Sequence, residues 1–151
     1  MNVIVDANIV FSGILNSNGK IGDLLINSDK HFSFLAPNFL RMEIYNHRNK
    51  LLKISKLTPE QLFEAEHHIF KSITFISEEQ ISEESWFFAD KLVSDIDPKD
   101  TVYIAYAEEF NCNLWTGDKK LISGLTRKKY SKFTTTDNLL LVRNAFWANN
   151  K

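Results

Sequence analysis

Cysteine, proline and glycine are scarce in this chain: its 151 residues include one cysteine, three prolines and five glycines. The lone Cys112 cannot form an internal disulfide, which fits a reducing compartment, and it excludes a metal site built from several cysteines. There is no repeat of fixed period, no low-complexity stretch and no linker rich in proline or glycine. We therefore expect a single domain spanning residues 1–151, located in the cytoplasm.

Long apolar runs are also missing, because no segment approaches the roughly 20 apolar residues that a membrane-spanning helix needs. The N-terminus lacks the basic start and the small-residue cleavage site of a signal peptide, so we expect a soluble protein with no membrane partner. Neither sign of charge dominates, since 18 Lys and Arg residues stand against 19 Asp and Glu residues, for a formal net charge of −1. The absence of a global positive field weakens a nucleic-acid-binding function without excluding it.

Hydrophobic residues make up 44% of the chain, which is enough for a substantial core. Short apolar segments alternate with segments of helical periodicity, and this alternation predicts an α/β fold: a mainly parallel sheet of about five short strands with helices on both faces. Asn38, Thr58 and Ser77 are predicted to cap three of the helices. Strands are predicted at residues 2–5, 33–36, 72–76, 112–115 and near 133. The first predicted helical segment begins at about residue 9 and is interrupted at 16–19. Further helices are predicted at 38–55, 58–71, 77–95, 97–111 and 119–124, and one more after the last strand.

Two of the predicted strands end in an acid. Asp6 follows the apolar run at 3–5, and Asp118 follows the strand at 112–115. An aspartate at such a position can simply cap the helix that comes next. However, ligands of open parallel sheets bind beyond the carboxyl ends of the strands, which is where both acids are expected to lie.

A third acid is expected near the same edge. In "SDIDPKDTVYIAYA", Asp97 and Pro98 are typical of a helix N-terminus, and this leaves the carboxylate of Asp100 free to point elsewhere. Asp100 shares a helix face with the apolar Ile104 and Ala107, so we expect it at the end of the buried face.

Glu43 is the fourth candidate acid, in the helix predicted at 38–55. It follows Met42 and lies one turn after Phe39, a position at the border of an apolar stripe that suits a carboxylate facing a cleft. It could instead be a surface acid next to His47 at the i+4 spacing. Each of the four acids alone is more simply explained as structural, whereas all four together could occupy one edge of one sheet.

Clustered carboxylates repel one another unless a cation compensates their charge. With no cysteine set and no pair of histidines at ligand spacing, the expected cation is a hard one, Mg²⁺ or Mn²⁺, which prefers oxygen ligands. The chemistry that suits such a site is phosphodiester hydrolysis, in which a cation activates water and stabilises the leaving oxygen.

The ordered set "VIVDANIVFSGIL", "FLRMEIYNH", "DPKDTVYIAYA" and "LWTGDKKL" resembles the PIN-domain family of metal-dependent ribonucleases, over nearly the whole chain. The resemblance implies a three-layer α/β/α sandwich in which acids hold Mg²⁺ or Mn²⁺ and cut RNA. Because many bacterial members are toxins of toxin–antitoxin pairs, it also implies a small antitoxin partner and a homodimer.

The matched motif positions imply a role for each acid and for two polar neighbours. The catalytic acids would be Asp6, Glu43, Asp100 and Asp118. The metal ligands would be Asp6, Asp100 and Asp118, with Glu43 and Asp97 as further candidates, although Asp97 could serve only as a helix cap. The supporting polar residues would be Asn8 and Thr116.

Basic and aromatic residues could also bind RNA. A patch that flanks the last acid could hold phosphates, or it could be an ordinary solvated helix face. We expect the tryptophans to belong to the core, and we assign the four histidines no function. The patch comprises Lys119, Lys120, Arg127, Lys128, Lys129 and Lys132, of which the first four are the candidate RNA-binding residues; the tryptophans are Trp86, Trp115 and Trp147.

Two other functions stay open from the sequence. Asp6 could accept a phosphoryl group, as the aspartate after the first strand does in phosphatases and receiver domains. The phosphatases need a second acid two residues later, where this chain has Asn8, and receiver domains need an acidic pair near the N-terminus, where "MNVIVDAN" supplies one acid. The chain could also be a PIN-like binding module without catalysis, although it carries all four acids.

Overall fold

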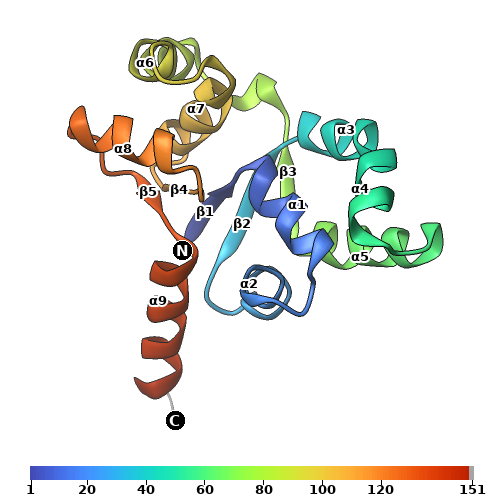
Figure 1. Cartoon of the computed structure of the whole chain (residues 1–151). Helices are drawn as coiled ribbons and strands as arrows, with labels where there is room; N and C mark the ends of the chain where they lie inside the picture. Colours follow the sequence, from blue (N-terminus) through green and yellow to red (C-terminus); the bar gives the residue numbers. More distant parts are fainter. Residues whose placement is uncertain (150–151) are drawn as a thin grey trace.

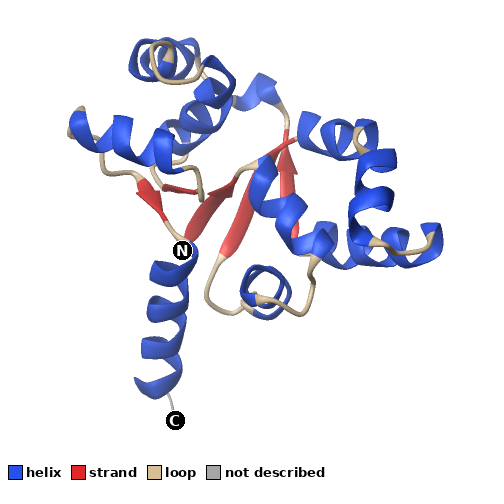
Figure 2. Ribbon diagram, viewed as in Figure 1, coloured by secondary structure: helices blue, strands red, loops and turns tan. Residues whose placement is uncertain are grey.

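The structure is a computed structural model that describes residues 1–149. A sheet of five parallel strands forms its centre, in the order β3-β2-β1-β4-β5 (Figure 2). The strands are β1 Asn2–Val5, β2 Ser33–Pro37, β3 Ile73–Ile76, β4 Asn113–Trp115 and β5 Phe133–Thr134. The predicted parallel sheet and the α/β class are confirmed.

Helices cover both faces of the sheet, which gives the expected three layers (Figure 1). On one face α7 packs against β1, β2 and β4, with α6 against α7, while on the other α1, α2 and α5 pack together. The helices are α1 Ala7–Leu15, α2 Lys20–Asn27, α3 Phe39–Asn46, α4 Arg48–Ser55, α5 Pro59–Lys71, α6 Glu83–Val93, α7 Thr101–Glu109, α8 Lys119–Arg127 and α9 Thr136–Asn149, and two 3₁₀ turns are η1 Glu78–Gln80 and η2 Pro98–Asp100.

Strand β1 lies at the centre of the core. Its three apolar residues, 3–5, are fully buried because strands cover both edges of β1 and helices cover both faces. From β1 the chain builds β2 and β3 on one side, and it then returns to place β4 on the other side. The strand order therefore reverses between β1 and β4, and such a switch point leaves a crevice at the carboxyl ends of the two strands.

The helix predicted at 38–55 is in fact two helices that meet at His47. The backbone of His47 leaves the helical region, with φ −98° and ψ 14°, and its imidazole Nδ1 lies 2.8 Å from the carbonyl oxygen of Glu43. The turn lets the next helix, α4, pack beside α5, where Arg48 forms an ion pair with the buried Glu66 at 3.0 Å. Helical periodicity continues through the turn, so the sequence pattern could not locate the break.

Two of the predicted caps are also wrong. Asn38 makes no side-chain cap hydrogen bond, because its own backbone is already helical. Ser77 caps only the 3₁₀ turn η1, whereas Ser82 caps α6 by accepting a hydrogen bond from the Ser85 N–H at 3.2 Å. The third prediction is confirmed, since Thr58 forms a full capping box at the start of α5.

The last helix, α9, joins the body through a buried arginine. Arg143 is 4% exposed, and it donates to Asp23 at 2.7 Å and to Ser28 at 3.1 Å. Trp147 was expected in the core but is 42% exposed, with the Arg143 guanidinium 4.3 Å from its ring centroid. No helix within residues 1–149 is both long and apolar enough to cross a membrane.

Candidate functional site

Asp6 and Asp118 leave the sheet at the switch point between β1 and β4. Val5 is paired with Trp115 in the parallel ladder, so Asp6 is level with Thr116, and Asp118 follows two residues later. The Asp118 N–H donates to the Thr116 hydroxyl at 3.1 Å, which folds the turn back towards β1. The structure thus brings together the two acids that follow strands, as the sequence predicted.

Both acids also cap the helices that follow them. One carboxylate oxygen of Asp6, Oδ1, accepts a hydrogen bond from the Ile9 N–H at 2.9 Å. Oδ1 of Asp118 accepts from the backbone N–H groups of Lys120 and Leu121 at 3.0 and 3.2 Å. Capping and a site at the sheet edge are therefore compatible, because a cap fixes the direction of the carboxylate and uses only one of its oxygens.

Asp100 approaches these acids from the start of α7. Asp97 caps the preceding 3₁₀ turn by accepting from the Lys99 N–H at 3.0 Å, whereas Asp100 makes no cap hydrogen bond. Its Oδ2 atom is buried and has no hydrogen-bond partner in residues 1–149. Ile104 is fully buried on the same face of α7, which confirms that Asp100 stands at the end of the buried face.

The electrostatics show that these carboxylates act on one another. Burial, and then repulsion by Asp97, Asp118 and Asp6, raises the pKa of Asp100 to about 7. Burial also raises the pKa of Asp6 to about 6, although the hydrogen bonds from Ile9 and Thr116 oppose this rise. Buried carboxylates with raised pKa values and acidic neighbours are typical of functional sites.

Glu43 lies at the border of the cluster. Partial burial raises its pKa, and the nearby positive groups of His47 and Lys99 offset part of this rise. Tyr103 lies between Glu43 and the aspartates and is only 5% exposed. Burial raises the pKa of the Tyr103 hydroxyl, and the negative charges of Glu43, Asp6 and Asp100 raise it further. The Tyr103 hydroxyl forms no well-aligned hydrogen bond within residues 1–149, although the backbone N–H of Ala7 lies near it and opposes the rise in its pKa.

Tyr103 is a residue of this site that the sequence pattern did not single out. It follows Asp100 by three residues, so the helical repeat places both side chains on the same face of the helix. That spacing was the available signal, but a tyrosine among apolar residues is usually core.

The remaining predicted site residues lie in different places. Asn8 is exposed in the first turn of α1, and its backbone N–H lies near the Asp6 carboxylate and lowers the pKa of that group. Lys119 and Lys120 begin α8 beside Asp118, on the exposed surface. Arg127 and Lys128 lie two turns away, and Lys128 pairs with Asp95, so the structure splits the predicted basic patch into two parts.

The chemistry of the donor set fits a hard divalent cation. Every candidate ligand is a carboxylate, and Asp100 contributes a buried oxygen without a partner. Within residues 1–149, no three His, Cys, Asp or Glu side chains are arranged to hold a metal ion as they stand. Binding would therefore require side-chain rotation, for which Asp97 and Asp118 have the freedom of partly exposed groups.

Comparisons with known proteins agree with this architecture. Residues 4–141 match the model of the PIN domain family, and the chain therefore belongs to that family. A chain in the crystal structure of VapBC2 from Rickettsia felis bound to a DNA fragment from their promoter has a similar fold, with a TM-score of 0.63. It is 16% identical in sequence, and the match covers 89% of this chain and 98% of that chain. A search of curated protein sequences gives no match.

Proposed function

We propose that this protein is a Mg²⁺- or Mn²⁺-dependent endoribonuclease. The observation that carries the proposal is the buried, unpartnered oxygen of Asp100 beside Asp6, Asp97 and Asp118 at the switch point of a PIN-domain sheet. Buried carboxylates that repel one another are unfavourable on their own, and a divalent cation would relieve that repulsion.

Asp6, Asp100 and Asp118 would hold the cation, with Glu43 and Asp97 as further ligands at the border. When bound, a divalent cation would supply positive charge to the scissile phosphate and lower the pKa of water for attack. Binding would also release the proton that Asp100 holds near neutral pH, because a metal ligand must be deprotonated.

Residues of the chain itself would orient these groups and the substrate. Hydrogen bonds from the Ile9 N–H to Asp6, and from the N–H groups of Lys120 and Leu121 to Oδ1 of Asp118, would keep both carboxylates at this edge of the sheet while small rotations adjust them to a cation. Thr116 ties the two turns together through its hydroxyl. Exposed ammonium groups of Lys119 and Lys120 lie beside Asp118, where they would contact phosphates of the RNA backbone.

We also propose that the protein acts in the cytoplasm as the toxin of a toxin–antitoxin pair. Membership of the PIN domain family and the similarity in fold to a chain of the VapBC2 structure support this assignment. A small protein would then bind and inhibit it. Leu141 and Val142 on α9 are 67% and 44% exposed, and such apolar surface is available for a homodimer.

Cleavage of a mixed-sequence single-stranded RNA tests the nuclease assignment. The wild-type protein should cut in Mg²⁺ or Mn²⁺ and not in EDTA, and folded Asp6→Asn and Asp100→Asn proteins should not cut. Cutting that persists in EDTA, or that both variants share, would contradict the proposal, and so would an uncut RNA of mixed sequence in all conditions.

A further inference from the structure

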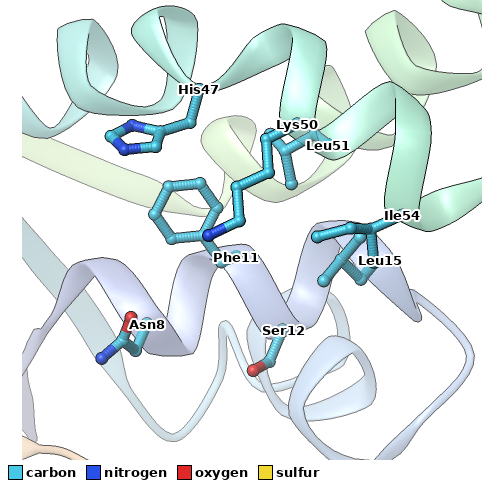
Figure 3. A pocket seen from close by; sticks show the side chains of 8 residues that line it. All are labelled: Asn8, Phe11, Ser12, Leu15, His47, Lys50, Leu51 and Ile54. Carbon is cyan, nitrogen blue, oxygen red and sulfur yellow. The ribbon is translucent and has the colours of Figure 1, made fainter.

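A second cleft adjoins the carboxylate cluster. It has a volume of about 410 Å³ and lies between α1 and α4, as Figure 3 shows. Phe11 and Ser12 line it from α1, His47 and Lys50 line it from the other wall, and Leu51 forms part of its floor. Clefts of this volume with an apolar floor and a few polar groups are typical of small-ligand sites.

The cleft presents flat rings to an occupant. The Phe11 ring and the His47 imidazole meet edge to face, with centroids 5.6 Å apart and planes at 80°. Nδ1 of His47 lies 2.8 Å from the Glu43 carbonyl oxygen, and this contact holds the imidazole in place at the border of the cleft. Nucleobases stack on such rings largely independently of their sequence.

The charge of the cleft favours an anionic occupant. Helix α4 carries Arg48, Lys50 and Lys53 and no acid. Arg48 is neutralised by Glu66, whereas Lys50 forms no ion pair in the part of the chain that the structure describes and extends into the cleft towards α1 (Figure 3). No acid lines the cleft among the described residues. An occupant with a negative charge beside an apolar plane would therefore match it best.

Both walls of the cleft lead directly to the carboxylates. On one wall Asn8 lines the cleft, and its backbone N–H is one of the groups that lower the pKa of Asp6. On the other wall His47 follows Glu43 by one helical turn. A polymer whose phosphate lay at the carboxylates would therefore pass the next nucleotide into the cleft.

We propose that this cleft binds one unpaired nucleotide of the RNA, adjacent to the scissile phosphate, with the base against Phe11 and His47 and a phosphate at Lys50. The inference rests on the proposed nuclease function and extends it, because it defines the substrate as single-stranded at the cleavage site. A base that remains paired in a duplex cannot leave its stack to enter the cleft.

Binding of a fluorescein-labelled, unstructured ten-nucleotide RNA tests the proposal. Fluorescence anisotropy in EDTA separates binding from cleavage. Lys50→Gln should weaken binding about threefold to tenfold and reduce the slope of log K against log salt by about 0.7. Phe11→Leu should weaken it by up to about tenfold. Lys71→Gln makes the same change in charge at the exposed end of α5, outside the lining of the cleft, and should bind as the wild type does.

Three results distinguish this inference from the nuclease assignment. Weaker binding by Lys50→Gln and Phe11→Leu, and no such effect on a duplex of the same sequence, supports the nucleotide site even if the wild type fails to cut in Mn²⁺. If neither variant changes RNA binding, or if the wild type does not bind the RNA, the nucleotide site is overturned, even where Mn²⁺-dependent cleavage is observed. A protein segment would then be the remaining occupant of the cleft. Lys50 is exposed, so Lys50→Gln remains informative if Phe11→Leu proves unstable.

Discussion

Val5 and Trp115 are paired residues at the ends of two neighbouring parallel strands, β1 and β4. Their register aligns the two turns that follow, so Asp6 lies level with Thr116 and close enough to Asp118 for the charges to interact. Both strand residues are fully buried, which fixes this alignment through the core. The relative position of the two acids is therefore a property of the sheet and not of flexible loops.

Replacing Asp6 should separate its capping function from its charge. Asn at this position can still accept the Ile9 N–H bond, whereas Ala cannot. Both changes remove the buried charge, so their difference reports the hydrogen bonds of the side chain, chiefly the cap bond from Ile9 and the bond from Thr116. We expect Asp6→Asn to be more stable than Asp6→Ala by about 1 kcal/mol in urea unfolding. Equal stabilities would mean that the cap contributes nothing to α1.

The free energy of unfolding should fall as the pH rises in EDTA. The pKa values of Asp6 and Asp100 are raised to about 6 and about 7, from 3.8 for an ordinary aspartate. Between about pH 4 and pH 7 the unfolded chain therefore loses protons that the folded chain retains, and this favours unfolding. Asp100→Asn should flatten the profile and exceed the wild type in stability at pH 7.5, by roughly 1 kcal/mol or more. The lowered pKa values of Asp23, Asp95 and Glu109 act in the opposite sense only near the acid end of this window, so a wild-type profile that rises between about pH 5.5 and pH 7 would contradict the raised pKa values.

The sequence located the acids at the ends of β1 and β4 better than it located the ends of the helices around them. The acids after β1 and β4 are recognisable because an apolar run ends abruptly in a carboxylate, and parallel strands deliver their ends to one edge. The break at His47 depends on the packing of α4 against α5, which the local pattern does not encode. The exposure of Trp147 likewise depends on the position of α9. That position is set by the hydrogen bond between Arg143 and Asp23, which are far apart in the chain.

The sequence places Tyr103 on the helix face of Asp100 but does not show the surroundings of its hydroxyl. The sequence pattern around a tyrosine in an apolar stripe is the same whether its hydroxyl reaches water or is buried. Only the tertiary structure shows that this hydroxyl is buried between Glu43 and the aspartates.

Tyr103→Phe should raise the stability of the protein. The Tyr103 hydroxyl is buried, and the nearby Ala7 N–H forms no well-aligned hydrogen bond with it, so removing the hydroxyl eliminates a largely uncompensated desolvation cost. We expect a gain of about 1 kcal/mol in the free energy of unfolding. A loss of similar size would show that the hydroxyl has a partner in solution. Comparing RNA cleavage by the same variant would show whether the hydroxyl also acts in the reaction.

Arg143→Met should weaken the attachment of α9. Arg143 is buried and donates to Asp23 and Ser28 on the α2 side, so its loss leaves those acceptors without their partner. We expect a cost of about 2 kcal/mol in urea unfolding. Lys20→Met is the matched control, because the Lys20 contact with Asp137 is 3.9 Å long and exposed, and it should cost almost nothing. Equal effects of the two variants would contradict the structural importance of Arg143.

Direct Mn²⁺ binding, measured by isothermal titration calorimetry at pH 7.5, tests the central claim most simply because it needs no RNA. The wild type should bind the ion, and Asp6→Asn, Asp100→Asn and Asp118→Asn should each bind at least about tenfold more weakly. Asp29→Asn, in the exposed turn between α2 and β2, is the control and should match the wild type. A wild type that binds no Mn²⁺, or an Asp100→Asn protein that binds it equally well, would contradict a metal centre at the switch point.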